Sequence, residues 1–144
     1  LPKMRASQVW QWMYKRGITD FASMTDINKQ TREQLAEHFT IGRAGLSRDA
    51  VSFDATRKWL VKFRDENEVE TVWIPDAPRG TLCISSQVGC TLSCTFCHTG
   101  TQRLVRNLTA GDIVTQVLIA KDSLGDWIPP GRRETPASPS HGTS

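Results

Sequence analysis

Three cysteines lie close together in this 144-residue chain, at Cys90, Cys94 and Cys97, with the spacing C-x3-C-x2-C. A cubane iron–sulfur cluster takes one thiolate per iron, so three thiolates leave one iron open. An open iron can bind a substrate or cofactor as well as pass electrons. The spacing therefore predicts a [4Fe-4S] cluster with one exchangeable position, held by a single short segment of the chain.

Two other uses of these thiols stay open. Zinc could take the same three cysteines with Cys83 or His98 as a fourth ligand, although structural zinc sites usually combine two separated ligand pairs and the chain has no second pair. Inert thiols are the other alternative. A disulfide framework is typical of secreted chains, and no signal peptide is evident.

Four cysteines without a secretory signal suggest a reducing cytoplasm. The chain is 38% hydrophobic and 23% charged, as in ordinary soluble domains, and no apolar run has the length of a membrane span. Its net charge of +3 is too small to indicate nucleic acid by itself. Residues 1–45 hold this excess, with seven Lys and Arg against four Asp and Glu.

The first 45 residues are predicted to be helical. Ser7 is a suitable N-cap for a helix over 8–15, and a second helix is expected over 30–38. We expect Trp10 and Trp12 to lie in the core of this segment. Together these features predict a small helical domain over residues 1–45.

A period of two replaces the helical period from residue 46. Apolar residues alternate around Val51 and Phe53, then from Trp59, then from Val69, with turn residues between the runs. This pattern predicts a three-stranded antiparallel meander. The Pro- and Gly-containing stretch 75–80 is interpreted as a linker that ends this second part, residues 46–80.

The third part, residues 81–126, reads as strand, cysteine loop and helix. A short strand over 81–85 leads into the loop, and Thr109 with Asp112 forms a capping box that opens a helix to Lys121. The helix presents Ile113, Val117 and Ala120 inward. One such βα unit cannot bury its own faces. With a disordered tail expected over 127–144, the chain is interpreted as a fragment truncated at both ends.

The cysteine triad resembles the signature of radical S-adenosylmethionine (SAM) enzymes, and the longer pattern resembles the RlmN family. These are bacterial radical SAM methyltransferases that modify C2 of adenine in ribosomal and transfer RNA. The resemblance runs from about Ala6 to Trp127. It rests on Phe21 to Asp26 with Lys29 and Arg32, Thr56 to Lys58, Val69 to Val72 with Ile74 and Pro75, Cys83 to Cys90, Thr99 with Gly100, and Arg106 to Leu108.

The resemblance implies a fold, cofactors and their ligands. The expected fold is α+β, with the small helical domain and the antiparallel meander leading into the first βα unit of a radical SAM partial (β/α) barrel. Cys90, Cys94 and Cys97 would bind the [4Fe-4S] cluster, and Phe96 would lie against SAM. The cluster and SAM would supply a 5′-deoxyadenosyl radical.

Two further residues gain chemical roles from the resemblance. Glu70 matches a proton acceptor, and Cys83 matches the cysteine that resolves a covalent RNA–enzyme intermediate through a transient disulfide. Both have ordinary alternatives. Glu70 could pair with Lys58 or Lys62 across the strands, and Cys83 could be a small buried apolar residue.

The resemblance also implies partners. Ribosomal RNA (23S) and transfer RNA would be substrates, with Arg103 and Arg106 as candidate phosphate contacts and the helical segment 1–45 as an accessory RNA-binding domain. We expect a cytoplasmic monomer that has no membrane contact and takes electrons from a donor such as flavodoxin.

One departure from the family is large. The family first methylates a cysteine near its C-terminus, and all four cysteines of this chain already have other roles. We therefore expect the chain alone to be inactive. A related adenine-C8 RNA methyltransferase and a non-catalytic zinc or iron–sulfur RNA-binding module remain as alternative functions.

Overall fold

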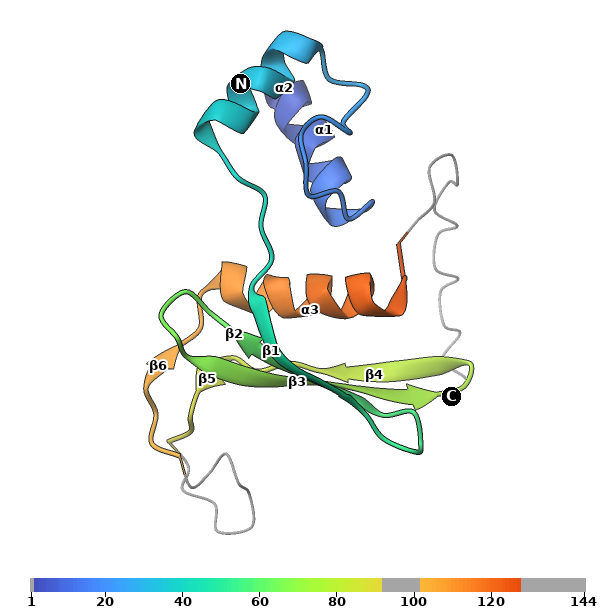
Figure 1. The fold of residues 1–144 in the computed structure, drawn as a ribbon, viewed down its shortest axis with the longest axis vertical. Helices are drawn as coiled ribbons and strands as arrows, with labels where there is room; N and C mark the ends of the chain where they lie inside the picture. Colours follow the sequence, from blue (N-terminus) through green and yellow to red (C-terminus); the bar gives the residue numbers. More distant parts are fainter. Residues whose placement is uncertain (1, 92–101, 128–144) are drawn as a thin grey trace, which may run out of the picture. The chain divides into compact units, whose positions relative to one another are not determined.

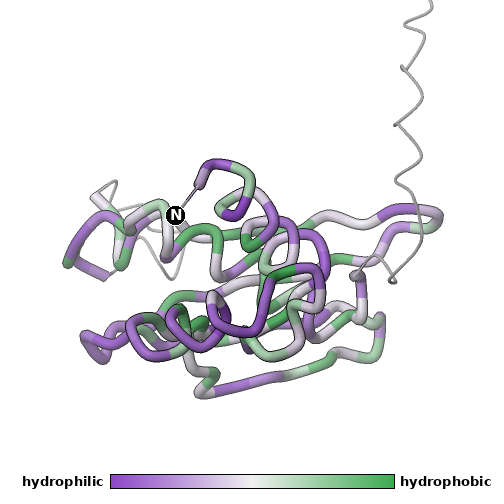
Figure 2. Tube along the Cα trace, turned by 90° about the horizontal axis from the view of Figure 1, so that it is seen from above, coloured by the Kyte–Doolittle hydropathy of each residue, from purple (hydrophilic) through white to green (hydrophobic). Residues whose placement is uncertain are grey.

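The structure is a computed structural model that describes residues 2–91 and 102–127 (Figure 1). The chain forms two compact units. Of the described residues, 2–39 with 126–127 belong to one unit, and 40–91 with 102–125 belong to the other. Hydrophilic and hydrophobic stretches alternate along the trace (Figure 2), as expected where elements bury one side and expose the other.

The first unit contains helices α1 (Lys3–Tyr14) and α2 (Lys29–His38). The predicted start of the first helix after Ser7 is wrong, because α1 already begins after Pro2. Proline suits the start of a helix, where its missing N–H leaves no bond unmade. Helix α2 agrees with its prediction to within one residue, and the Asn28 side chain caps it by accepting from Thr31 N at 2.8 Å.

The core of this unit lies between α1 and the turn before α2. Its buried side chains are Trp12, Phe21, Met24 and Ile27. Trp12 Nε1 also donates to Asp26 Oδ1 at 2.5 Å, which ties α1 to the turn. The core prediction is confirmed for Trp12. It is wrong for the other tryptophan of α1, Trp10, which is 51% exposed and lies beside the Tyr14 ring.

The second unit is built on a four-stranded antiparallel sheet in the order β1-β2-β3-β4. Its strands are β1 (Gly45–Val51), β2 (Arg57–Lys62), β3 (Glu68–Asp76) and β4 (Arg79–Cys83). The predicted meander is confirmed and gains one strand. The predicted linker is wrong, because Pro75 pairs with Gly80 in a tight β3–β4 hairpin.

Two turns of the same design join β1 to β2 and β2 to β3. Asp54 accepts from Thr56 N at 3.0 Å, and Asp65 accepts from Asn67 N at 3.2 Å. Phe53 therefore lies within a turn, fully exposed, and the prediction that it belongs to the apolar face of the first strand is wrong. Asx turns of this kind are strong local stop signals for a strand.

Helix α3 (Ala110–Leu124) covers one face of the sheet (Figure 1). The predicted capping box is present: Thr109 Oγ1 accepts from Asp112 N, and Asp112 accepts from Thr109 N. Gly125 ends the helix in the left-handed conformation, with φ of 65°. The core between helix and sheet comprises Trp59, Val61, Phe63, Val69, Val88, Leu108, Ile119 and Ala120.

The segment that carries the cysteines leaves and re-enters the fold through a short antiparallel pair. Strand β5 (Gln87–Val88) pairs with β6 (Arg106–Asn107). Within the described ranges all named strand pairs are antiparallel, so the α+β class is confirmed and a parallel sheet is not seen there. None of the helices in those ranges is long and apolar enough to cross a bilayer.

One buried side chain joins α3 to the sheet. Gln116 is fully buried, and its Oε1 accepts from Thr71 Oγ1 and from Ser85 N, both at 2.9 Å. Its Nε2 donates to Ser85 O at 2.9 Å and to Asp112 O at 3.2 Å. The amide thus uses its full bonding capacity on the helix, on β3 and on the segment after β4.

Replacing this amide tests its contribution to stability. We expect Gln116→Leu to lower the free energy of unfolding by about 2–4 kcal/mol, because the Thr71 hydroxyl would be left buried without a partner and the part-buried Ser85 amide would lose its acceptor. Urea denaturation followed by circular dichroism measures this. Gln34→Leu, the same change at an exposed position of α2, should cost less than about 0.5 kcal/mol. Equal effects of the two changes would contradict the assignment.

Candidate functional site

The face of the sheet opposite α3 brings Glu70 and Cys83 together. Trp59, Val61, Val69 and Thr71 point to the core, so the residues between them point to the other face, which we call the outer face. Cys83 pairs with Val72, and Glu70 lies two residues along β3 from Val72. Such diagonal neighbours lie about 7–8 Å apart on one face of a sheet.

Both side chains are open to solvent. Cys83 is exposed, so the ordinary alternative, that it is a small buried apolar residue, is wrong. The Glu70 side chain is 53% exposed and pairs with Lys58, whose Nζ lies 3.2 Å from Glu70 Oε1. The cross-strand ion pair expected as the ordinary alternative is therefore present. The role of Glu70 as proton acceptor stays a prediction.

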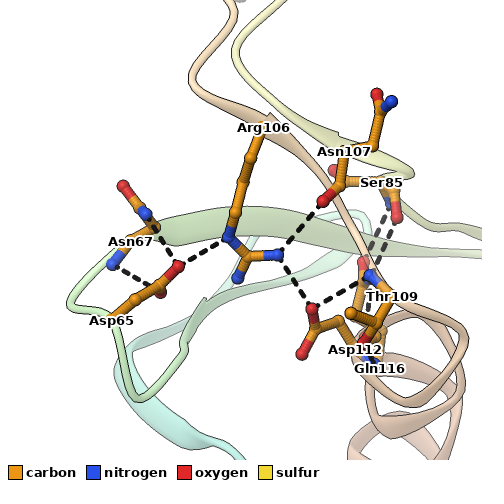
Figure 3. Close-up of polar contacts among 8 residues, drawn as sticks. All are labelled: Asp65, Asn67, Ser85, Arg106, Asn107, Thr109, Asp112 and Gln116. Carbon is orange, nitrogen blue, oxygen red and sulfur yellow. Dashed lines mark hydrogen bonds and ion pairs between the residues drawn. The ribbon is translucent and has the colours of Figure 1, made fainter.

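The backbone beneath these side chains is fixed by polar contacts. Ser85 Oγ donates to Glu70 O at 2.8 Å, which holds the segment after β4 against β3. On the inner side, the Gln116 amide bonds both backbone groups of Ser85 (Figure 3). It also accepts a hydrogen bond from the Thr71 hydroxyl. Residues next to Glu70 and close to Cys83 are thus held by one buried amide. The relative placement of the two chemical groups follows from the fold and not from an exposed loop.

The cysteine segment is closed at its base. Cys90 N donates to Gln102 O at 3.1 Å, and Val105 N donates to Val88 O at 2.8 Å. Gly89 makes this closure possible: its φ is 76°, and an added Cβ would lie 2.1 Å from Arg103 O. The two ends of the segment, residues 86–90 and 102–108, are therefore joined by backbone hydrogen bonds, and we call this pairing the neck.

The structure describes only one of the expected cluster ligands. Cys90 is half-buried at the neck, and Cys94, Cys97 and Phe96 lie outside the described residues. Over residues 2–91 and 102–127, no group of three or more His, Cys, Asp and Glu side chains is arranged to hold a metal ion. The donor chemistry of the sequence, three thiolates in one segment, suits an iron–sulfur cluster.

Arg106 attaches strand β6 to the rest of the second unit through ion pairs. Its Nε donates to Asp65 Oδ2 at 2.5 Å, and its Nη1 donates to Asp112 Oδ2 at 2.9 Å and to Asn107 O at 3.2 Å (Figure 3). The guanidinium also lies 5.5 Å from the centroid of the Phe63 ring. One cation thereby links the β2–β3 turn, β6 and the first turn of α3.

The contacts with Arg106 lower the pKa values of both carboxylates that it bonds. The hydrogen bond from Arg106 lowers the pKa of Asp65 from its usual 3.8 to about 2, with Asn67 contributing. Burial acts to raise the pKa of Asp112, but hydrogen bonds from Arg106 and Thr109 outweigh it and leave the pKa lowered. The predicted phosphate contacts of Arg106 and of exposed Arg103 stay predictions, and two carboxylates already engage Arg106.

The buried role of Gln116 and the partners of Arg106 were not predicted from the sequence. A signal for Gln116 existed, because it lies three residues after Ile113 and four before Ala120, on the stripe expected to be apolar. A lone polar residue in such a stripe indicates a buried hydrogen-bonding role. The Asp65–Arg106 contact joins residues 41 positions apart and left no local signal.

Comparisons with known proteins decide the family. Residues 2–41 match the model of the ribosomal RNA large subunit methyltransferase N-terminal domain. Proteins named dual-specificity RNA methyltransferase RlmN are 59% identical in Rhodopseudomonas palustris, over 93% of this chain, and 62% identical in Novosphingobium aromaticivorans, over 87%. The chain belongs to the RlmN family. It spans about a third of these relatives, 34% and 29% of their lengths.

A solved structure agrees with the RlmN assignment. The crystal structure of a radical SAM methyltransferase from Sphaerobacter thermophilus superimposes with a TM-score of 0.76 at 36% identity. The match covers 88% of this chain and 37% of that protein. The fold described above therefore matches one part of that radical SAM methyltransferase.

The Asp65–Arg106 pair predicts a specific acid sensitivity. Because the pKa of Asp65 is lowered in the folded state, the pair stabilises the fold above about pH 4 and this contribution is lost as pH falls from 3.8 through about 2. Asp65→Asn should therefore be less stable than the parent at pH 6, and the difference should shrink toward pH 2. Urea denaturation at a series of pH values measures it.

Asp54→Asn is the matched control, since Asp54 occupies the equivalent place in the preceding turn and accepts from Thr56. Its effect on stability should change less over the same pH interval. A loss of stability in Asp65→Asn that does not vary with pH would contradict the role of the ion pair.

Proposed function

We propose that this chain carries the catalytic sheet and the cluster-binding segment of a radical SAM RNA methyltransferase that methylates C2 of adenine in 23S ribosomal RNA and transfer RNA. The observation that supports this most directly is the placement of Glu70 and Cys83 as exposed diagonal neighbours on one face of the four-stranded sheet. The relatives are named dual-specificity RNA methyltransferases, which supports methyl transfer to RNA.

Cys90, Cys94 and Cys97 would hold the [4Fe-4S] cluster, with Phe96 against SAM. Bound together, the cluster and SAM supply the radical that activates the methyl carbon for addition to the unreactive C2 position. The neck at Gly89 and Cys90 fixes where the segment leaves the fold. We propose that residues 81–126 begin the partial (β/α) barrel of the complete enzyme.

Glu70 and Cys83 would complete the transfer. After the methyl carbon has joined C2, the adduct gives up its unpaired electron to a one-electron acceptor, such as the oxidised form of the electron carrier. The Glu70 carboxylate accepts the proton that C2 loses. The Cys83 thiolate attacks the sulfur of the thioether that links RNA to enzyme. An S–S bond forms as the S–C bond breaks, and the carbon keeps the electron pair and takes a proton. A dithiol reductant then regenerates both thiols. The two residues face one base because they share one face of the sheet.

The remaining assignments concern organisation and partners. We propose that residues 1–45 form an RNA-binding accessory domain, residues 46–80 the meander and residues 81–126 the start of the radical SAM core, with residues 127–144 as a tail. The enzyme would act in the cytoplasm as a monomer and take electrons from a donor such as flavodoxin. Arg103 and Arg106 are the candidate phosphate contacts.

The test uses a hybrid enzyme, in which this chain replaces the aligned third of the Rhodopseudomonas palustris relative. The hybrid, with cluster, SAM and reductant, should convert adenine in a ribosomal RNA hairpin to 2-methyladenine, identified by mass spectrometry of the digested RNA. Cys83→Ala should stall with RNA covalently attached, because no thiol resolves the adduct. Glu70→Gln should lower turnover by about 100-fold or more.

Thr81→Ala is the matched control, since Thr81 lies on the same strand and face as Cys83, two residues away. It should form product without accumulating an adduct. Product carrying 8-methyladenine would assign the related C8 activity, and a hybrid that binds zinc and remains colourless would indicate a non-catalytic module. The 144-residue chain alone should transfer no methyl group, because it has no cysteine left to accept one.

A further inference from the structure

Glu70 has two lysines at equivalent positions on the neighbouring strand. Leu60 of β2 pairs with Glu70, and Lys58 and Lys62 lie two residues to either side of Leu60 on the same face. Both lysines are therefore diagonal neighbours of Glu70, within reach of a long side chain. They differ in direction. Lys58 pairs with Val72, which pairs with Cys83, so Lys58 lies on the Cys83 side of Glu70. Lys62 pairs with Glu68, on the other side.

The two lysines pair with different carboxylates in the structure. Lys58 Nζ contacts Glu70 Oε1 at 3.2 Å. Lys62 instead forms an ion pair with Glu66 in the β2–β3 turn, and its hydrogen bond with Glu66 raises the pKa of the Lys62 ammonium. The Glu66 backbone is held by the turn, with its N–H donating to Phe63 O at 3.1 Å. Glu66 of the β2–β3 turn thus pairs with Lys62, which would otherwise attract the Glu70 carboxylate away from Cys83.

We propose that Lys58 is a positioning residue for the methyl transfer: its ammonium holds the Glu70 carboxylate on the side of the sheet face where Cys83 lies. This inference rests on the proposed function of Glu70. The pair is half exposed, so it adds little to folding stability. Once RNA covers the face and water leaves, the same attraction acts in a lower dielectric and is stronger. Its effect therefore falls on catalysis.

The experiment compares Lys58→Met with Lys62→Met in the hybrid enzyme. The two variants lose the same charge, from the same strand and face, at the same offset from Glu70. Lys58→Met should lower kcat by about 10- to 100-fold, as expected for a displaced catalytic group, and should leave KM for RNA within about twofold. Lys62→Met should keep kcat within about twofold of the parent. Lys58→Arg should recover most of the loss, because the guanidinium can hold the same carboxylate.

A double-mutant comparison shows whether Lys58 acts through Glu70. On the Glu70→Gln background, Lys58→Met should change the residual rate by less than about twofold, since the group that it positions is already gone. Independent, multiplicative losses would overturn the proposal. So would an unchanged kcat in Lys58→Met, equal losses in Lys58→Met and Lys62→Met, or a raised KM at constant kcat, which would mean that Lys58 binds RNA.

The same variants separate this proposal from the proposed function. An inactive Glu70→Gln with a fully active Lys58→Met overturns only the positioning role. A fully active Glu70→Gln overturns both, because the carboxylate would then not be the proton acceptor. Since Lys58 is exposed, Lys58→Met and Lys58→Arg should have the same denaturation midpoint as the parent, which confirms that any lost rate is not lost folding.

Discussion

The buried amide of Gln116 is the contact on which the arrangement of the outer face depends. It reaches from the middle of α3 to the Thr71 hydroxyl and to both backbone groups of Ser85. Side chains alternate along a strand, so fixing Thr71 on the inner face fixes Glu70 on the outer face. Ser85 follows Cys83 by two residues and bonds the Glu70 backbone. A side chain that contacts neither proposed catalytic group therefore sets the distance between them.

The two faces of the sheet have different physical roles. The inner face packs its apolar side chains, with Val88 and Leu108 from the neck, against α3, and this burial supplies most of the stability of the unit. The outer face carries exposed charges whose pairs contribute little to folding. Arg106 bonds Asp65 in the β2–β3 turn and Asp112 in α3, so that the neck of the cysteine segment is held by charge as well as by packing. Residues on the outer face are thus free to serve chemistry.

Strong local signals explain which parts were predictable from sequence. The capping box at Thr109 and Asp112 and the period-two runs of β2 and β3 were enough to predict α3 and the meander. The β3–β4 hairpin was missed because Pro75 and Gly80 signal a linker and a turn equally well. Pro75 is tolerated because β2 pairing stops at Trp73, so no ladder bond is lost. Strand register alone could not predict whether Glu70 pairs with Lys58 or with Lys62. Glu70 pairs with Lys58 because the turn residue Glu66 engages Lys62. The proposed roles of Cys94, Cys97 and Phe96 came from motif resemblance and lie outside the described residues.

The most direct test of the account is whether Cys83 meets the C2 edge of the target adenine. An RNA hairpin carrying a short activated-disulfide tether on C2 would be mixed with the hybrid enzyme, beside the same hairpin tethered at C8. Mass spectrometry would then locate and time the crosslinks. We expect rapid crosslinking of the C2 tether to Cys83, lost in Cys83→Ala, and slow crosslinking from C8. Equal rates from C2 and C8, or crosslinking at another cysteine, would contradict it.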